Sequence, residues 1–378
     1  TRFTPDDLIW PPPPSPPSPP PPPSPPPPSP VGTSPATSIA LGGWHSCALL
    51  TDGAINCWGD NGKLGDGSTT DSTNPVKVSG ISTATSIALD GLHSCALLSG
   101  GTIKCWGWNY HGQLGDGTTI ERTIPVEVSN ITTATSIALG GEHSCALLTG
   151  GAIKCWGKNK FGELGDGTTT DRTTPVDVSG ITTATSIALG GGHSCALLAG
   201  GAIKCWGRNE EGQLGDPTTT AISSNIPVDV SGISTATSIA LGGEHSCALL
   251  TGGAIKCWGW NGYGQLGDGT TTQSFTPVDV TGITTATSIA LGGSHSCALL
   301  TGDAIKCWGW NYHGQLGAVV YTGDVATTDS TTPVEVSGIS TATSIALGYH
   351  HSCALLTSGA IKCWGSNSNG RLGGGTTT

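Results

Sequence analysis

Short runs of hydrophobic and alternating residues recur along the chain, separated by Gly, Asp, Asn and Pro. The unit at residues 131–180 reads ITTATSIALGGEHSCALLTGGAIKCWGKNKFGELGDGTTTDRTTPVDVSG and holds four such runs: TSIAL, HSCALL, AIKCWG and TPVDVS. Runs of this length bounded by turn residues are typical of β-strands, and no helix-length stretch follows a 3.6-residue period. Each unit is therefore predicted to form three or four short strands.

The unit occurs seven times. Measured between the first cysteines of successive HSC motifs, the steps are 48, 50, 50, 52, 50 and 56 residues. Seven repeats of three or four strands predict an all-β fold, a seven-bladed β-propeller. The expected organisation is an N-terminal segment (residues 1–10), a proline-rich segment (11–30) and the seven-repeat propeller (31–378).

Cysteine occupies the same two places in every repeat. An even number at fixed spacing predicts disulfides and an oxidising, secreted setting. Structural zinc is the weaker interpretation, because such sites usually bring two ligands two to four residues apart and nine residues separate each pair here. The predicted disulfides are Cys47–Cys57, Cys95–Cys105, Cys145–Cys155, Cys195–Cys205, Cys247–Cys257, Cys297–Cys307 and Cys353–Cys363.

The disulfide spacing fits a β-hairpin. Pairing Cys145 with Cys155 across two strands leaves residues 149–151 as a three-residue loop, which commonly needs a left-handed residue at its last position. Glycine adopts that conformation without strain and Asp tolerates it. The residues at this position are Gly53, Gly101, Gly151, Gly201, Gly253, Asp303 and Gly359.

Residues 11–30, PPPPSPPSPPPPPSPPPPSP, have a different composition. Proline cannot donate to a sheet or continue a helix, so this segment is predicted to form a polyproline II rod. At about 3.1 Å per residue the rod would be about 60 Å long.

The motifs G-G-x-H-S-x-A-L, W-G-x-N-x-x-G-x-L-G-x-G and P-x-x-V, as in HSCALLTGGAIKCWGKNKFGELGDG and TTPVDVSG, resemble the regulator of chromosome condensation repeat family. The resemblance runs from Val31 to the end of the chain and implies a seven-bladed propeller. One disulfide in every blade departs from the usual family pattern and suits an extracellular relative.

The Pro-Val strand is absent from the last repeat, which ends at RLGGGTTT. The sequence SPVGTS (residues 29–34), just after the proline-rich segment, is expected to supply the missing strand and close the ring. The strand would come from the same chain or from a neighbouring subunit.

The proline-rich segment resembles the SP(n) modules of hydroxyproline-rich glycoproteins in plant and green-algal cell walls. This resemblance implies hydroxylation and O-linked sugars at Pro11, Pro12, Pro13, Pro14, Pro16, Pro17, Pro19, Pro20, Pro21, Pro22, Pro23, Pro25, Pro26, Pro27, Pro28 and Pro30; an unmodified linker is the alternative. Asn130-Ile131-Thr132 is an N-glycosylation sequon, so Asn130 is a predicted glycan site.

One His and one Trp of each cassette are expected to be structural. Each His before the first Cys should hydrogen-bond the backbone of its own blade, because seven dispersed imidazoles do not converge on one metal. Each Trp after the second Cys should pack between blades. The LGDGTTTD loops lack the dense oxygen ligands of a calcium site and are interpreted as Gly-rich turns.

No residue set in the sequence predicts catalysis, a metal site or a cofactor, since catalytic residues should occur once rather than seven times. Positions that break the repeat are better candidates for function, because varied loops of a propeller gather where partners bind. The candidate partner contacts are Trp44, Trp108, Trp260, Trp310 and Tyr321.

The net charge of −11 disfavours nucleic acid as a partner, and no apolar run is long enough to span a membrane. Position 1 is not Met, which we interpret as a processed mature chain. The expected function is that of a non-enzymatic, secreted and glycosylated structural protein that assembles with copies of itself into a filament or layer at a cell surface, wall or flagellum. The alternatives are an extracellular glycan- or protein-binding propeller on a glycosylated stalk, and an intracellular exchange factor or scaffold.

Overall fold

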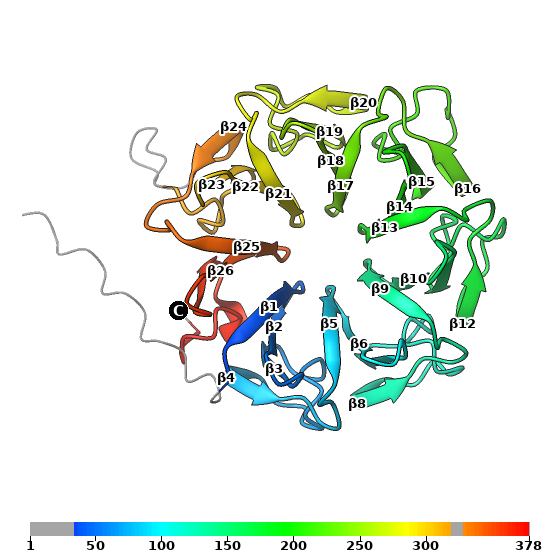
Figure 1. Ribbon diagram of the computed structural model, residues 1–378, viewed down its shortest axis with the longest axis vertical. Coiled ribbons are helices and arrows are strands. Elements are labelled where there is room, and N and C mark those ends of the chain that lie inside the picture. The colour runs from blue at the N-terminus through cyan, green and yellow to red at the C-terminus, as the bar shows by residue number, and fades with distance from the viewer. Residues whose placement is uncertain (1–33, 319–327, 378) are drawn as a thin grey trace, which may run out of the picture.

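The computed structural model describes residues 34–318 and 328–377 as a ring of seven antiparallel sheets. Figure 1 shows the sheets arranged as blades around a central axis, with the first strand of each blade innermost and the fourth on the outer rim. Neighbouring strands in each sheet are consecutive in sequence. The predicted all-β, seven-bladed propeller is confirmed. Residues 11–30, with the expected polyproline rod, lie outside the described residues.

The first four blades have four strands each. They are β1 (Ala36–Leu41), β2 (His45–Leu50), β3 (Ile55–Gly59) and β4 (Ser72–Lys77); β5 (Ala84–Leu89), β6 (His93–Leu98), β7 (Ile103–Gly107) and β8 (Arg122–Glu127); β9 (Ala134–Leu139), β10 (His143–Leu148), β11 (Ile153–Gly157) and β12 (Arg172–Asp177); and β13 (Ala184–Leu189), β14 (His193–Leu198), β15 (Ile203–Arg208) and β16 (Ser223–Asp229).

Blades five and six also have four strands, and blade seven has three among the described residues. They are β17 (Ala236–Leu241), β18 (His245–Leu250), β19 (Ile255–Gly259) and β20 (Ser274–Asp279); β21 (Ala286–Leu291), β22 (His295–Leu300), β23 (Ile305–Gly309) and β24 (Ser330–Glu335); and β25 (Ala342–Leu347), β26 (His351–Leu356) and β27 (Ile361–Gly365), followed by the 3₁₀ turn η1 (Ser368–Gly370).

The second and third strands of each blade form the predicted hairpin. In blade three, Cys145 lies opposite Cys155, with a Cα–Cα distance of 4.1 Å, and Gly151 closes the turn with φ +88°. Asp303, the one substitution for glycine at this position, has φ +67°. All seven predicted disulfides are formed, and no described cysteine is free.

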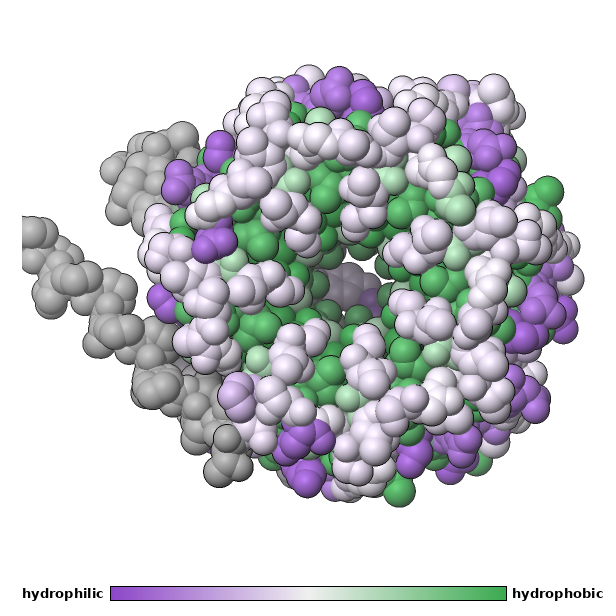
Figure 2. Space-filling model, in the orientation of Figure 1, coloured by the Kyte–Doolittle hydropathy of each residue, from purple (hydrophilic) through white to green (hydrophobic). Residues whose placement is uncertain are grey.

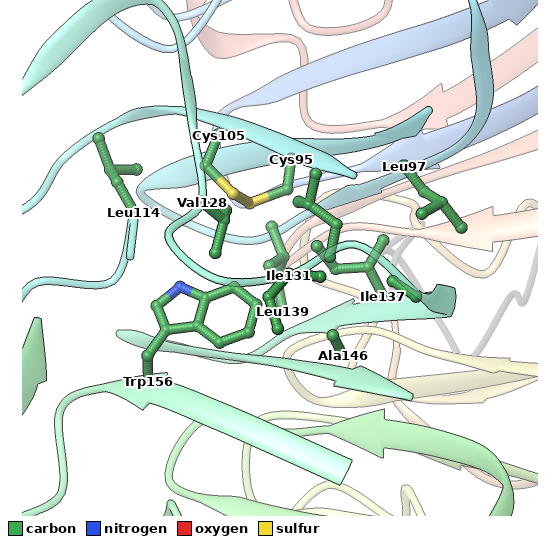
Figure 3. Close-up of a cluster of buried hydrophobic side chains, with 12 residues drawn as sticks. Cys95, Leu97, Cys105, Leu114, Val128, Ile131, Ile137, Leu139, Ala146 and Trp156 are labelled. Carbon is green, nitrogen blue, oxygen red and sulfur yellow. A yellow bond between two sulfur atoms is a disulfide. The ribbon is translucent and has the colours of Figure 1, made fainter. Parts of the chain in front are cut away.

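The hydrophobic core lies between blades, in one cluster per junction. Figure 3 shows the cluster between blades two and three, in which Trp156 packs near the Cys95–Cys105 disulfide, Leu114 and Ile131. Burying a Trp side chain removes a large apolar area from water. The predicted role of the repeated Trp in packing between blades is confirmed.

The ring closes through the loop that follows β27. The carbonyl of Arg371 accepts hydrogen bonds from Trp58 Nε1 and Ser46 Oγ of blade one, both at 2.8 Å. Gly375 N donates to Thr73 O at 3.2 Å. Of the expected closing strand, residues 29–34, only Ser34 belongs to the described part, and its Oγ donates to Asp52 Oδ2 at 3.1 Å.

Candidate functional site

The repeated histidines form a hydrogen-bonded ring around the propeller. His143 Nε2 lies 2.8 Å from Ser194 Oγ, in the next blade. Ser194 Oγ donates its single hydrogen to the carbonyl of Glu163, to which Trp206 Nε1 also donates, so the imidazole Nε2 is the donor to the serine. The seven pairs are His45–Ser94, His93–Ser144, His143–Ser194, His193–Ser246, His245–Ser296, His295–Ser352 and His351–Ser46.

The expectation that each His ties its own blade through the backbone was wrong. The side chain crosses the blade boundary, because the Ser of the next HSC strand lies at hydrogen-bond distance there. Burial lowers the pKa of six of these histidines to about 3, and it also lowers the pKa of His351. The imidazoles are therefore neutral at ordinary pH and serve as fixed hydrogen-bond donors between blades.

The central axis is narrow. Tyr349 of blade seven lies against Gly43, Gly91 and Gly293, where an added Cβ would be 2.7, 3.2 and 2.9 Å from its ring. Asp90 lines a cavity on this axis, and burial raises the pKa of its side chain to about 7. Figure 2 shows the central hollow on one face, surrounded by hydrophobic residues. The cavity measures about 90 Å³, and its leucines are Leu41, Leu89, Leu139, Leu189, Leu241, Leu291 and Leu347.

Aromatic side chains form a continuous arc on the face that carries the loop after the third strand. Ring centroids are 5.2 Å apart for Trp260 and Tyr263, 5.9 Å for Tyr263 and Trp310, and 4.9 Å for Trp310 and His350. Trp44 of blade one continues the arc, 6.3 Å from His350. We call this arc the aromatic ridge; it spans blades five, six, seven and one and comprises Trp260, Tyr263, Trp310, Tyr312, His313, His350 and Trp44.

The ridge is accessible to a partner. Tyr312 is 70% exposed and Trp44 41% exposed, while Trp260 and Trp310 are half-buried. Tyr312 stacks on Trp310 with an angle of 9° between the ring planes. The ridge therefore offers several flat aromatic surfaces in a row.

Charged side chains dominate the adjoining part of the same face. In blade three, Lys158 pairs with Glu142. Arg208 Nη1 of blade four lies 2.6 Å from Glu244 Oε1 of blade five. The Arg208 guanidinium is also 5.6 Å from the centre of the Phe161 ring. A cavity of about 360 Å³ separates these residues from the ridge and is lined by both sets, including Arg208, Glu244, Phe161, Trp260, Tyr349 and His350.

Comparison with known proteins agrees with this architecture. A model of the RCC1-like domain matches residues 18–298 and 131–378. The chain belongs to the RCC1-like domain family. The comparison with curated protein sequences gives no match.

Solved structures share the fold of this RCC1-like propeller at low sequence identity. Human WBSCR16 is 22% identical, with a TM-score of 0.78, covering 86% of this chain and 87% of that chain. Yeast RCC1 (Prp20) bound to Kap60 is 21% identical, with a TM-score of 0.76, covering 91% and 86%. The ectodomain of the receptor kinase CR4 from Physcomitrella patens is 22% identical, with a TM-score of 0.55, covering 88% and 73%.

The RCC1-like propeller brings together three of the five candidate partner contacts. Trp44, Trp260 and Trp310 belong to the ridge, whereas Trp108 stands apart in blade two beside Tyr110, at 6.4 Å. Tyr321 lies outside the described residues. Sequence reasoning missed Tyr263, Tyr312 and His313. The signal was an aromatic residue in the motifs NGYGQ and NYHGQ directly after the extra Trp.

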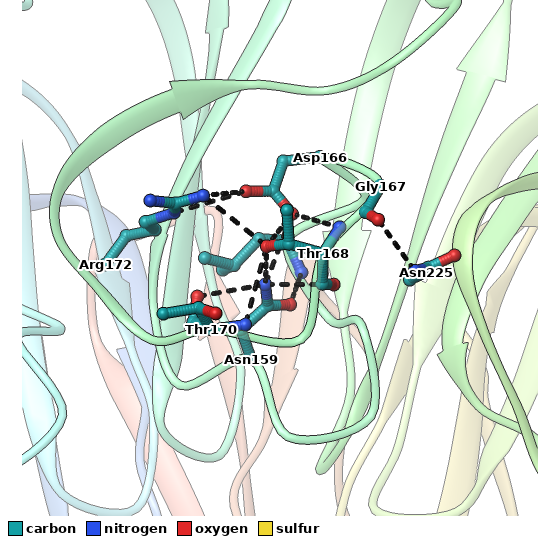
Figure 4. A network of polar contacts seen from close by, with 8 residues as sticks. Asn159, Asp166, Gly167, Thr168, Thr170, Arg172 and Asn225 are labelled. Atoms are coloured by element: carbon teal, nitrogen blue, oxygen red, sulfur yellow. Dashed lines mark hydrogen bonds and ion pairs between the residues drawn. The ribbon is translucent and has the colours of Figure 1, made fainter.

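The LGDGT loops of the RCC1-like propeller are internally bonded turns, as predicted. Figure 4 shows Asn159 Nδ2 donating to the carbonyls of Thr168 and Thr170, while the Asp166 carboxylate binds Arg172 and the Thr168 hydroxyl. The carboxylate oxygens are thus already occupied by protein donors. No group of three or more His, Cys, Asp or Glu suited to a metal ion occurs within residues 34–318 and 328–377.

The sequon residue Asn130 lies in an exposed turn after β8. Its φ is +57°, and the equivalent turn residues of other blades, such as Gly180 with φ +70°, are glycines. The exposed side chain is accessible to modification, and glycosylation of Asn130 stays a prediction. Within the described part of the chain, no helix has the length and hydrophobicity of a membrane-spanning segment.

Proposed function

We propose that this RCC1-like propeller is a secreted, glycosylated, non-catalytic structural protein that assembles with copies of itself into an extracellular filament or surface layer. The observation that carries the proposal is the aromatic ridge, which spans four consecutive blades of one face. Aromatic-lined surfaces bind polyproline II segments, because proline rings pack flat against aromatic rings. The chain itself carries sixteen prolines within residues 11–30.

A proline-rich segment of one copy bound to the ridge of the next is a head-to-tail contact. Such a contact repeats without closing unless the geometry returns to the starting subunit, and it therefore generates filaments. The pre-extended polyproline II conformation loses little entropy on binding, which favours this kind of contact. Hydroxylation and O-linked sugars on the prolines would add polar groups that the ridge histidines and tyrosines can hydrogen-bond.

The disulfides support an extracellular location. Seven disulfides in one chain are typical of proteins that fold in an oxidising compartment. Physcomitrella CR4, which shares the fold, is described as a receptor ectodomain. The same feature disfavours the intracellular alternative, although yeast Prp20, another protein of this fold, is described as binding Gsp1p and histones.

Matched variants test the self-assembly proposal. Tyr312 and Tyr110 occupy identical CWGWNYHGQLG segments and are each 70% exposed, but Tyr312 lies on the ridge and Tyr110 does not. We expect full-length protein to form filaments in negative-stain electron microscopy, Y312A to reduce their number and length at least tenfold, and Y110A to leave them unchanged. Dispersed monomers of the parent at high concentration, or equal effects of the two variants, would refute the proposal. Hydroxyproline and sugar analysis of the native protein checks the glycoprotein assignment.

One observation favours a second candidate function, a glycan-binding propeller. The cavity of about 360 Å³ places the Trp260 ring beside Arg208 and Glu244. An aromatic face beside charged hydrogen-bonding groups suits the apolar face and hydroxyls of a sugar. Binding of soluble oligosaccharides that is lost in R208A, in protein that stays monomeric, would favour this candidate over self-assembly.

A further inference from the structure

The outer side of β27 in blade seven has no partner strand among the described residues, whereas a fourth strand covers this side in every other blade. In blade three, β12 pairs with β11, with Cys155 opposite Val176, and Ile153, Cys155 and Trp156 are buried. In blade seven, no described strand pairs with the outer side of β27. Its counterpart side chains are only partly buried: Ile361, Cys363 and Trp364.

Within residues 34–318 and 328–377, this edge of β27 also has no backbone donor. In each of the six four-stranded blades, the second Val of the PVxV motif donates its N–H to the first residue of the third strand, as Val178 N does to Ile153 O at 3.0 Å. Among the described residues, none makes the equivalent backbone contact with Ile361 O. An unpaired edge of this kind is a template for strand addition.

The chain contains one Pro-Val pair for each blade. Six belong to the fourth strands, and the seventh is Pro30-Val31, before β1. The step from the Pro to the Ala that begins the next inner strand is nine residues in all six blades, as from Pro175 to Ala184. From Pro30 to Ala36 it is six residues.

This shorter step prevents the seventh pair from completing its own ring in the common register. Pro35 O accepts a bond from Thr51 N at 3.0 Å, just as Thr183 O accepts one from Ala199 N at 2.9 Å, so Pro35 takes the place of Thr183. With Pro30-Val31 in the register of Pro175-Val176, Ser34 would take the place of Ser179. One peptide step, from Ser34 to Pro35, would then have to span a path that takes four steps in the other blades.

Shifting residues 29–34 along β27 of their own propeller does not provide the missing backbone hydrogen bond either. Counting back from Pro35, the place of Val178 falls on Pro30, which has no N–H to donate to Ile361 O. The backbone also leaves the common path at Ser34. A Cβ on Gly151 would lie 2.8 Å from Thr182 O, whereas the atoms nearest a Cβ on the equivalent Gly359 belong to Pro35 and Ala36.

We infer that β27 accepts residues 29–34 of a second copy as its fourth strand, with Pro30-Val31 in the register of Pro175-Val176. Thr33 then takes the place of Val178 and has the N–H that Ile361 O requires. Only four residues separate Val31 from β1 of the donor, so the two propellers lie close together. The inference rests on the proposed function in naming a second copy as partner, and it adds the strand that joins the copies.

Cross-linking between isotopically distinct copies tests the inference on the full chain. Heavy and light proteins carrying a photo-reactive amino acid in place of Val31 are mixed before assembly and irradiated. We expect heavy–light cross-links from position 31 to the peptide containing Ile361–Gly365. Cross-links confined to a single copy, or none to that peptide, would overturn the inference.

A pair of donor variants adds a backbone readout. T33P removes the N–H and should reduce heavy–light cross-links at least tenfold, whereas T33S keeps the N–H and should leave them unchanged; equal yields in the two variants would overturn the inference. The outcome is separable from that of the proposed function. Heavy–light cross-links that persist in Y312A, without filaments in the parent, would refute the ridge-based assembly and leave strand exchange standing.

Discussion

The ring of buried histidines predicts a propeller that loses stability in mild acid. The pKa of His143 is about 3 in the folded chain because of its burial, and five other ring histidines have the same value. An unfolded histidine has a pKa of about 6.5. Between these values the unfolded chain binds protons that the folded chain does not. The free energy of unfolding therefore falls as the pH falls from about 6.5 toward 3.

The effect is large because it recurs seven times. At pH 5.5 each such histidine contributes about 1.4 kcal/mol less to stability than at pH 7.5. Seven such sites sum to about 10 kcal/mol. Asp90, whose pKa is raised to about 7 in the folded chain, gains a proton in the same pH range and offsets about 2 kcal/mol. The net loss of about 8 kcal/mol is a large part of the stability of an ordinary domain. With an unfolding entropy of about 0.7 kcal/mol/K for a chain of this size, the melting temperature should fall by about 11 °C between pH 7.5 and 5.5.

Thermal unfolding followed by near-ultraviolet circular dichroism, with the disulfides intact, measures this fall. In H143Q the decrease in melting temperature between pH 7.5 and 5.5 should be about 2 °C smaller, since one of the seven sites no longer takes up a proton. H313Q is the control, because His313 is an exposed ridge residue outside the ring, and its fall should match that of the parent. A fall of less than about 3 °C in the parent, or an unchanged fall in H143Q, would show that the ring does not govern acid stability.

Three further predictions concern single positions. S194A leaves the buried His143 Nε2–H without its acceptor and should lower the free energy of unfolding by about 1–3 kcal/mol in chemical denaturation. G151A should destabilise by more than about 1 kcal/mol, because φ is +88° and the new Cβ would meet Thr182 O, whereas D303G, at the equivalent turn, should stabilise by up to about 1 kcal/mol; melting temperatures decide both. N130Q should remove the mass of one N-linked glycan from protein secreted by a eukaryotic host, and an unchanged mass would mean that the sequon is unoccupied.

The sequence predicted the blade because the contacts that define it are local. Cys145 and Cys155 are ten positions apart, and the glycine that closes their turn lies between them. The histidine partner was not predictable in the same way. Ser194 lies 51 positions from His143, and every repeat has the same Ser, so the pattern is identical whether the bond stays in one blade or crosses to the next.

The ridge was predictable only in part for a related reason. Trp260 and Trp310 stand out as departures from the repeat, but their connection runs through Tyr263 and depends on how adjacent blades are spaced. The sequence around Tyr312 is identical to that around Tyr110. Tyr110, however, contacts the aromatic ring of Trp108 in its own blade and is not part of a row that crosses to the next blade. Identical local sequences thus acquire different surroundings from the blades beside them.

The repeated hydrogen bond between blades leaves one side chain free to vary at each junction. At each junction a backbone carbonyl accepts the Ser and Trp hydrogens, so the side chain of that residue is free to differ: Gln113 and Glu163 provide it in two blades, and Arg371 at the closure.

The side chain of Arg371 connects two features of the molecule, the ring closure and the aromatic ridge. Its buried guanidinium donates to Gly43 O at 2.9 Å and lies 5.0 Å from the centre of the Trp44 ring. Trp44 is the end of the aromatic ridge on blade one, and its neighbour His350 comes from blade seven. A partner bound along the ridge would therefore contact both sides of the closure at once and resist its opening. Assembly and ring closure should stabilise each other for this reason.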